Sequence, residues 1–209
     1  MLATEAQDER SHELVRAVAT AWKVPCDDGQ VAALVGYAES LLRWNARINL
    51  TAARSIDRVV AEHFPDAFAL ARRLAEPARV VDVGSGGGLP AIPLAVLCPR
   101  LTFELCEPIA KKASFLRTAL RELGLGDRAS VGTARGEAVA KAIERDPARA
   151  FDVAISRATL PPEKWLALAR RLVRPGGRLF VLTTPNVLPD LRDREVYDQG
   201  RRALIEVGA

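Results

Sequence analysis

Glycine stands at every second position of a segment that directly follows a mostly apolar run. Residues 80–90 read Val-Val-Asp-Val-Gly-Ser-Gly-Gly-Gly-Leu-Pro, with the alternating glycines at Gly84, Gly86 and Gly88. Glycine allows a tight turn and lets the backbone approach a ligand closely, because a Cβ there would intrude. Pro90 suits the first turn of a helix, whose free N–H groups attract a carboxylate or a phosphate. The stretch therefore predicts a ligand-binding loop between a strand and a helix.

The spacing of these glycines separates two cofactor classes. A dinucleotide fold needs Gly-x-Gly-x-x-Gly/Ala directly after the strand. Counted from Gly84, the sixth residue is Leu89, which fails; counted from two residues later it is an alanine, which comes too late for the strand. Methyltransferases carry apolar-apolar-acid-apolar-Gly-x-Gly-x-Gly, and residues 80–88 fit that pattern without adjustment. We therefore expect S-adenosylmethionine as the cofactor, with a nicotinamide cofactor as the alternative.

Two acidic residues end neighbouring predicted strands. Asp82 lies just before the first glycine, and Glu107 follows Gly88 by 19 residues at the end of the next apolar run. A carboxylate at that second position can accept both ribose hydroxyls of a nucleoside, and both cofactor classes use one. Together with the glycine loop, these carboxylates favour S-adenosylmethionine over a nicotinamide or over a glycine-rich turn with no ligand.

Residue patterns that are missing limit the reaction. Amino-group methyltransferases commonly carry Asp/Asn-Pro-Pro-aromatic after the fourth strand, whereas here that strand ends Ile-Ser-Arg-Ala at 155–158. Methylation of cytosine C5 needs a thiolate, and Cys98 follows a predicted helix rather than a strand. A substrate atom that is already nucleophilic needs neither device. Guanine N7 is such an atom, because it has a free lone pair and no proton to remove.

Strands and helices must alternate to position these residues. The predicted strands are 79–83, 101–106, 130–133, 151–156 and 178–182, and the predicted helices between them are 89–97, 111–123, 137–144 and 163–173. This alternation predicts an α/β fold with a parallel sheet covered by helices on both faces. Ligands of such sheets bind at the carboxyl ends of the strands. The remaining expectations are a turn at 175–177, a loop at 186–199 and a final strand at 203–207.

The first 75 residues are predicted to be helical. Pro25 is expected to stop the first helical segment, 10–22. Asp27 or Asp28 can cap a second helix, and Ser55 can cap a third. The third helix is expected to be interrupted near Pro65, with Asp66 as the cap of its continuation. We therefore divide the chain into a helical N-terminal extension, 1–75, and a methyltransferase domain, 76–209, which form one compact unit.

Composition narrows the class of protein. The net charge is +4, placed as −1 over residues 1–75 and +5 over 76–209, which favours a polyanionic partner. The arginine and alanine content is also typical of a GC-rich genome. Eleven aromatic residues are too few for a base-stacking platform.

The polar, acidic start and the lack of a long apolar run predict a cytoplasmic protein with no membrane contact. Three cysteines and two histidines show no zinc spacing, so no metal is expected.

A set of motifs between about Leu34 and Leu182 is shared with one family. They are Trp-Asn-x-x-Ile-Asn-Leu-Thr at 44–51, His-x-x-Asp at 63–66, Val-Asp-Val-Gly-x-Gly-x-Gly-Leu-Pro-x-Ile-Pro-Leu at 81–94, Glu-x-x-x-Lys-Lys-x-x-Phe-Leu at 107–116, Arg-Gly-Glu at 135–137 and Phe-Asp-x-x-Ile-Ser-Arg-Ala at 151–158. On these residues the chain resembles the bacterial 16S rRNA (guanine-N7) methyltransferases, also called the glucose-inhibited division protein B family. Gly-Leu-Pro-x-Ile-Pro and Asn-Leu-Thr are its most specific parts.

The resemblance implies a Rossmann-like class I S-adenosylmethionine-dependent methyltransferase fold. It also implies a monomer that methylates a guanosine in small-subunit ribosomal RNA, either naked or within an assembly particle. The loop and the resemblance together assign the cofactor to Asp82, Gly84, Gly86, Gly88, Leu89, Glu107, Gly136, Glu137 and Arg157. Contacts to the substrate are expected from Asn49, His63, Lys111, Lys112 and Arg135, with His63 as a capping or core residue in the alternative.

Arg135 and Arg157 are expected at strand ends on the ligand side of the sheet. We hypothesise that they hold phosphate or the carboxylate of the cofactor, because a guanidinium on guanine N7 would occupy the reacting lone pair. One departure from the family follows the last central strand, where Thr183-Thr184 stands in place of the usual Lys-Gly. It leaves open an RNA-binding relative with impaired catalysis, and a nicotinamide-dependent oxidoreductase is the more distant alternative.

Overall fold

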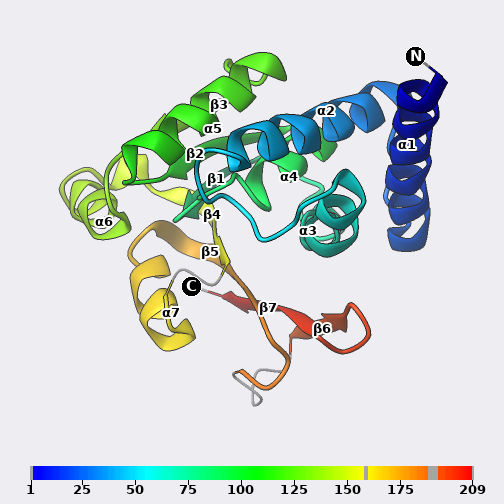
Figure 1. Cartoon of the computed structure of the whole chain (residues 1–209). Coiled ribbons are helices and arrows are strands. Elements are labelled where there is room, and N and C mark those ends of the chain that lie inside the picture. The colour runs from blue at the N-terminus through cyan, green and yellow to red at the C-terminus, as the bar shows by residue number, and fades with distance from the viewer. Residues whose placement is uncertain (1, 158–159, 188–192, 209) are drawn as a thin grey trace.

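A seven-stranded sheet lies between two layers of helices in the computed structural model (Figure 1), which describes residues 2–157, 160–187 and 193–208. The strands are β1 (Ala78–Val83), β2 (Leu101–Cys106), β3 (Ala129–Gly132), β4 (Phe151–Arg157), β5 (Val173–Thr183), β6 (Arg194–Tyr197) and β7 (Arg202–Gly208). Their order is β3-β2-β1-β4-β5-β7-β6. The first five strands are parallel, β7 pairs antiparallel with β5, and β6 pairs antiparallel with β7.

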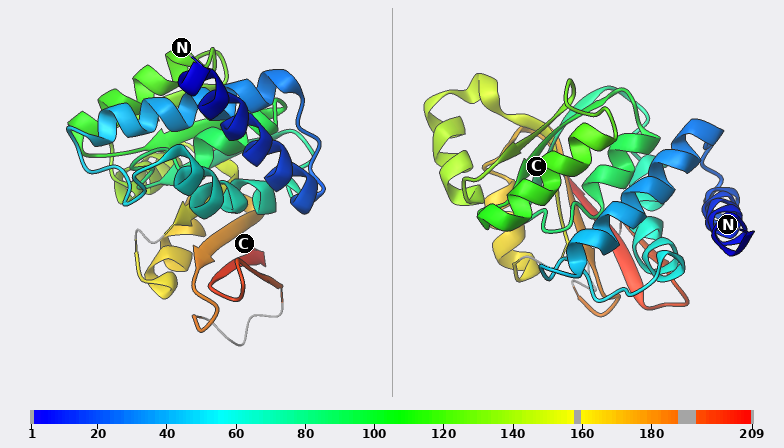
Figure 2. Two further views of the ribbon diagram at one scale, coloured as in Figure 1. Left: turned by 45° about the vertical axis from the view of Figure 1, so that its right-hand side comes forward. Right: turned by 45° about the horizontal axis from the view of Figure 1, so that its top comes forward.

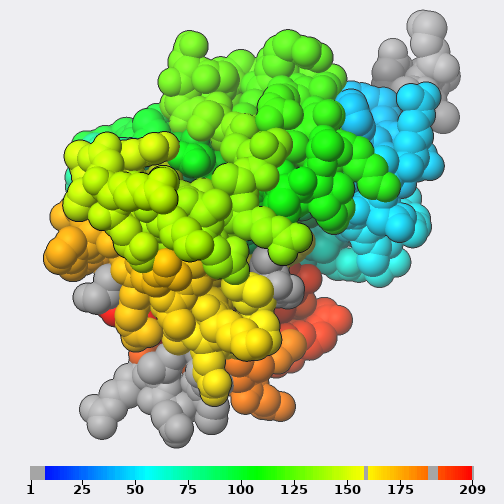
Figure 3. Space-filling view, turned by 90° about the vertical axis from the view of Figure 1, so that its left-hand side faces the viewer, coloured from blue at the N-terminus to red at the C-terminus, as the bar shows by residue number. Residues whose placement is uncertain are grey.

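Helices cover both faces of this sheet. They are α1 (Leu2–Trp22), α2 (Asp28–Asn45), α3 (Ile56–Ala71), α4 (Ala91–Leu97), α5 (Ala110–Glu122), α6 (Gly136–Arg145) and α7 (Pro162–Ala169), with a short 3-10 helix η1 (Pro147–Arg149). Figure 1 shows α2 to α5 on one face and α6 and α7 on the other. Figure 3 shows the α6 and α7 side, where the N-terminal helices reach the surface only at one edge. The predicted two-sided α/β architecture is confirmed.

Alternating side chains along each strand explain why both faces are buried. Val80 packs with the core formed by α1 to α5, whereas its neighbour Val81 packs with the core of α6 and α7. On β4, Ile155 packs with the core of α1 to α5, and its neighbour Ala154 packs with the core of α6 and α7. Successive residues of a strand point to opposite faces, so continuous apolar runs are what a sheet covered on both sides requires.

The N-terminal helices begin at the caps that the sequence predicted. The Asp27 side chain accepts a hydrogen bond from the Gln30 backbone N–H at 2.8 Å, and the Gln30 side chain accepts one from the Asp27 N–H at 3.0 Å. Ser55 caps α3 through the Arg58 N–H. Figure 2 shows α1 at the outer edge of the molecule, and α2 and α3 share the sheet's larger core.

The predicted interruption of the third helix is wrong. Helix α3 runs through Pro65 without a break, and Asp66 lies inside the helix rather than capping a new one. Proline removes one backbone hydrogen bond and introduces a local clash. The apolar face of α3, including Phe64 and Phe68, is completely buried, and this packing outweighs the local cost.

The region after the fourth strand also differs from the prediction. Strand β5 begins at Val173, so Pro-Gly-Gly at 175–177 forms an irregularity within the strand, where its register with β4 shifts, rather than a turn before it. Strand β6 lies inside the segment predicted as a loop, whereas β7 confirms the final strand. No described helix is long and apolar enough to cross a membrane. Ala158, the last residue of the shared motif on β4, is outside the described residues.

Candidate active site

The glycine loop between β1 and α4 has the backbone conformation that requires glycine. Gly84 and Gly86 have φ angles of 75° and 55°. A Cβ added at Gly86 would meet only the Gly84 carbonyl oxygen, at 3.8 Å, so the space beside this residue is open. Both glycines line a pocket at the carboxyl edge of the sheet. The loop therefore offers a ligand a close approach to bare backbone.

Gly88 serves a different purpose from the one that the sequence suggested. A Cβ at this position would lie 2.5 Å from Cδ1 of Ile92 and 3.0 Å from Cδ2 of Leu116. Gly88 is buried and does not line the pocket. Its lack of a side chain allows the loop to pack on α4 and α5, so it supports the pocket from behind.

Glu107 joins the end of β2 to the glycine loop. Its side chain is only 4% exposed. One carboxylate oxygen accepts the Gly86 N–H and the other accepts the Ile109 N–H, both at 2.8 Å. A carboxylate oxygen has two lone pairs, so each oxygen can accept one more hydrogen bond. This arrangement fits a pair of ribose hydroxyls approaching from the pocket.

Asp82 lies behind the loop, 1% exposed. Burial raises the pKa of its carboxyl to about 7, opposed by the Ser85 hydroxyl and by the charge of Arg157. Oδ2 of Asp82 has no hydrogen-bond partner among the described residues. A buried polar atom without a partner is costly for folding alone.

The pocket in front of the loop has a volume of about 420 Å³. It brings together these residues expected from the sequence: Gly84, Gly86, Glu107, Lys112, Arg135, Gly136, Glu137 and Arg157. Three expected residues, Asp82, Gly88 and Leu89, are buried and do not line it. Asn49 and Lys111 are exposed and lie outside both this pocket and the one described next.

Ile109 is one of several lining residues that the sequence analysis missed. The side chain of Ile109 is 45% exposed, which is unusual for a large apolar residue, and it lines the pocket two positions after Glu107. An exposed apolar side chain beside a polar carboxylate suits a ligand with a flat apolar ring next to a diol. Its position directly after the second strand was the signal that could have found it.

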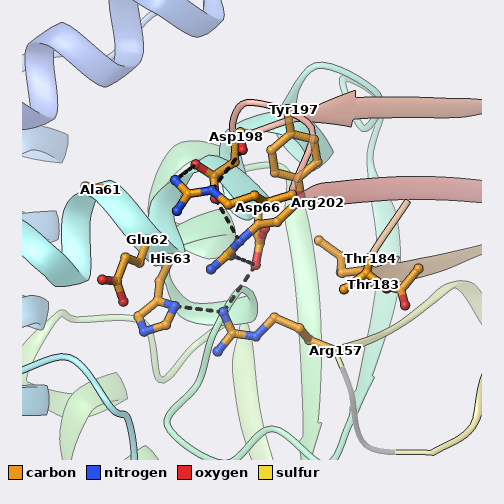
Figure 4. Close-up of a pocket in the computed structure, with 12 residues that line it drawn as sticks. Ala61, Glu62, His63, Asp66, Arg157, Thr183, Thr184, Tyr197, Asp198 and Arg202 are labelled. Atoms are coloured by element: carbon orange, nitrogen blue, oxygen red, sulfur yellow. Dashed lines mark hydrogen bonds and ion pairs between the residues drawn. The ribbon is translucent and has the colours of Figure 1, made fainter. Parts of the chain in front are cut away.

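A second pocket, drawn in Figure 4, has a volume of about 790 Å³. It lies between α3, the ends of β4 and β5, and the turn that joins β6 to β7. Its lining is Ala61, Glu62, His63, Asp66, Arg157, Leu182, Thr183, Thr184, Tyr197, Asp198, Arg201 and Arg202. Arg157 lines both pockets, so they meet at this guanidinium. Thr183 and Thr184, the departure from the family pattern, lie in this second pocket and not in the first.

Asp66 joins three elements beneath the second pocket. Its side chain is 1% exposed. Oδ2 accepts hydrogen bonds from Arg157 at 3.2 Å and from Arg202 at 2.9 Å, and Oδ1 accepts one from the Tyr197 hydroxyl at 2.6 Å. Burial and then the charge of Asp66 raise the pKa of Tyr197, which keeps its hydroxyl protonated. This carboxylate therefore ties α3 to β4 and to the β6–β7 hairpin.

His63 orients Arg157 from the other side (Figure 4). Its Nδ1 lies 3.0 Å from a guanidinium nitrogen of Arg157, and its Nε2 lies 2.7 Å from Oγ1 of Thr51. Arginine can only donate, so Nδ1 is the acceptor and Nε2 carries the proton. Burial, Arg157 and Arg202 lower the pKa of His63 to about 4, so the ring is neutral at physiological pH.

The motif at 44–51 acts mainly through Asn45. Its side-chain amide donates to the Thr51 carbonyl at 3.0 Å, and its oxygen accepts the N–H groups of Leu50 and Thr51. These bonds hold the loop that presents Thr51 to His63. Asn49, the asparagine predicted to contact substrate, is exposed within the same loop.

Most of this chain matches one known protein family. The family model described as rRNA small subunit methyltransferase G matches residues 30–196. The chain belongs to this family. Relatives named ribosomal RNA small subunit methyltransferase G are 34% identical in Anaeromyxobacter dehalogenans strain 2CP-1, over 84% of this chain and 79% of the relative, and 37% identical in Burkholderia pseudomallei strain 668, over 88% and 79%. The predicted family is confirmed.

Solved structures confirm the class of fold. An O-methyltransferase from Bacillus cereus, solved in complex with SAH, gives a TM-score of 0.65 at 18% identity over 97% of this chain and 99% of that one. The O-methyltransferase TomG from Streptomyces achromogenes, solved with SAM, gives 0.63 at 18% identity over 97% and 98%. The sheet and its helices are thus those of class I methyltransferases.

Proposed function

We propose that this member of the family transfers the methyl group of S-adenosylmethionine to N7 of a guanosine in small-subunit ribosomal RNA. The observation that carries the proposal is the buried Glu107 carboxylate, bonded to Gly86 in an open glycine loop at the carboxyl edge of the sheet. The name of the relatives, ribosomal RNA small subunit methyltransferase G, supplies the substrate class.

The residues of the first pocket fit the cofactor. S-adenosylmethionine supplies an electrophilic methyl group on a sulfonium. Glu107 would accept the ribose hydroxyls, and Ile109 would cover one face of the adenine. Gly84 and Gly86 would allow the amino-acid portion to approach the backbone. The N-terminal end of α6, with Gly136 and Glu137, closes the opposite wall.

Neither His63 nor Asp82 is placed to remove a proton from the target atom. His63 is neutral, but its Nδ1 already accepts from Arg157 and its Nε2 carries the proton. Asp82 has a pKa of about 7 but lies outside both pockets. The chain's contribution is therefore to place the two reactants in line, which can lower a barrier by several kcal/mol, on the order of 7. Guanine N7 suits this arrangement, because it has no proton to remove.

The arrangement of the chain supports further parts of the proposal. Residues 1–75 would form an extension that folds together with 76–209, since α2 and α3 share the core of the sheet. We also propose that the protein acts as a monomer in the cytoplasm, on naked RNA or on an assembly particle. Among the described residues, no group of three or more His, Cys, Asp or Glu side chains lies together as a metal site would require.

Methyl transfer to unmodified RNA tests the function. Purified protein is incubated with S-adenosylmethionine carrying a tritiated methyl group and with small-subunit RNA from a strain that lacks this methyltransferase. We expect label in that RNA and none in large-subunit RNA from the same cells. Cofactor binding without transfer would instead support an RNA-binding relative. Thermal stabilisation by NADH and not by S-adenosylmethionine would support an oxidoreductase.

A further inference from the structure

The pocket between α3 and the β6–β7 turn lies where a second reactant must be. It is formed at the ends of β4 and β5 by Arg157, Leu182 and Thr183. In parallel α/β sheets, ligands bind outside the carboxyl ends of the strands. Because Arg157 also lines the cofactor pocket, ligands in the two pockets would meet beside its guanidinium.

The volume of this pocket suits a nucleoside. It measures about 790 Å³, and small-molecule sites commonly span about 300–1,000 Å³. It is also the larger of the two pockets that share Arg157. The smaller one already has the carboxylate and the glycine loop that suit the cofactor. The larger one is thus the candidate for the target nucleotide.

The charges of the lining select which part of a nucleotide would enter. Arg157 and Arg202 donate to the buried Asp66, while Asp198 pairs with Arg201 at 2.7 Å and with Arg202 at 3.5 Å. A phosphate inside the pocket would have to compete with these two carboxylates for the same guanidinium groups. A neutral polar ring needs no such competition. The pairing therefore favours a nucleobase over a phosphate.

Hydrogen-bonding groups on the walls match a base that carries both donors and acceptors. The Glu62 carboxylate, whose Oε1 accepts from Arg58 at 2.7 Å, is an acceptor in the α3 wall. Thr183 and Thr184 provide hydroxyls, which both donate and accept, in the opposite wall. Guanine presents N–H donors on one edge and acceptors at O6 and N7 on the other.

Phosphates find their contacts on the rim instead. Arg201 pairs with Asp198 and Arg58 pairs with Glu62, but these two arginine side chains are 70% and 57% exposed. Exposed ion pairs contribute little free energy, so a phosphate can displace them. Contacts to phosphates position a nucleic acid, whereas contacts to base edges identify it. An RNA strand lying over α3 and the β6–β7 turn would place its backbone beside these arginines and one base above the pocket.

We propose that this pocket receives the target nucleobase, turned out of the RNA, between α3 and the β6–β7 turn, while the flanking phosphates lie outside on Arg58 and Arg201. The assignment rests on the proposed function. Enzymes that modify a base act on an unpaired one or turn it out of its stack into a pocket. Arg157 then stands at the junction where the base and the cofactor meet.

Filling the pocket from its exposed wall tests the assignment. Ala61 is an exposed residue of α3 in the lining, so Ala61→Trp would occupy the space without disturbing the core. Thr184→Trp fills it from the other side. Ala17→Trp, on an exposed face of α1 away from the pockets, is the matched control. Circular dichroism confirms that each variant folds.

The expected result separates the two pockets. Affinity for S-adenosylmethionine, measured by calorimetry, should change by less than about twofold in all three variants. Transfer to small-subunit RNA should fall by more than about tenfold in Ala61→Trp and Thr184→Trp, and stay at the wild-type rate in Ala17→Trp. Transfer by the two pocket variants at the rate of Ala17→Trp would overturn the assignment.

A binding measurement keeps the pocket testable if the wild type transfers no methyl group, which would contradict the proposed function itself. Guanosine and inorganic phosphate are added separately to the protein saturated with S-adenosylhomocysteine, and ligand-observed NMR reports contact. Contact of guanosine with the wild type that is lost in Ala61→Trp supports the pocket. Absence of that contact, its persistence in Ala61→Trp, or its displacement by inorganic phosphate overturns the proposal.

Discussion

Asp66 on α3 accepts a hydrogen bond from Arg157 at the end of β4, 91 residues further along the chain. The same oxygen accepts one from Arg202, so one buried carboxylate holds both guanidinium groups. Because Arg157 lines both pockets, this contact sets the position of the group that stands between them.

Replacing Asp66 with asparagine should destabilise the protein strongly. The change removes the buried carboxylate that pairs with both Arg157 and Arg202, and breaking a buried pair in this way costs about 3 kcal/mol. Urea unfolding measures the loss. Glu62→Gln, which removes a partly exposed i,i+4 pair with Arg58 on the same helix, is the control and should cost less than about 1 kcal/mol. Equal losses in the two variants would contradict the role of Asp66.

Gly86→Val should abolish binding of S-adenosylmethionine. Valine disfavours the φ of 55° at this position, and its side chain would enter the open space beside the loop. Calorimetry should show an affinity at least about a hundredfold lower. Unchanged affinity would refute the loop as the cofactor site.

Gly88→Ala should lower the free energy of unfolding, because Gly88 packs against α4 and does not line the cofactor pocket. Its Cβ would lie 2.5 Å from Ile92, so the packing of α4 against the loop must shift. We expect a loss of about 2 kcal/mol in the free energy of unfolding, as for overpacking of a core. A variant with wild-type unfolding in urea would show that the contact with Ile92 relaxes freely.

His63 should make stability depend on pH in the acid range. Its pKa is about 4 in the folded protein and about 6.5 in the unfolded chain, so the unfolded chain binds more protons between these values. Stability contributed by the neutral ring is present above pH 6.5 and is lost as the pH falls towards 4. Between pH 7 and pH 4.5 the wild type should lose about 2 kcal/mol more than His63→Asn.

Asp82 has the opposite pH dependence, because its folded pKa is raised to about 7. Asp82 contributes equally to the wild type and to His63→Asn. The difference between their unfolding free energies in urea therefore reports the contribution of His63 alone. An identical loss in the two proteins would show that His63 is not held neutral by burial and by Arg157.

Local patterns predicted the sheet well, because its signals lie within a few neighbouring residues. The apolar run 101–106 is strand β2 as predicted, and Asp27 and Ser55 cap the helices proposed for them. Strand β6 was missed because an edge strand can carry polar residues, and Arg194 and Glu195 then resemble a loop.

The candidate site was predictable where one segment contains its residues, as in the glycine loop. The network around Asp66 was not, because its partners Arg157, Tyr197 and Arg202 come from distant segments. The spacing His-x-x-Asp shows that two polar residues share one face of a helix. It does not show that this face meets the end of β4 and the C-terminal hairpin.

The chemical position of the methyl group tests the central claim most directly. Small-subunit RNA methylated by the purified protein is digested to nucleosides and analysed by liquid chromatography and mass spectrometry. We expect the transferred label in 7-methylguanosine alone, because N7 has a free lone pair with no proton to remove, and neither His63 nor Asp82 is placed to act as a general base. Label in a methylated amino group, in a ribose 2′-oxygen or in a pyrimidine would contradict the account.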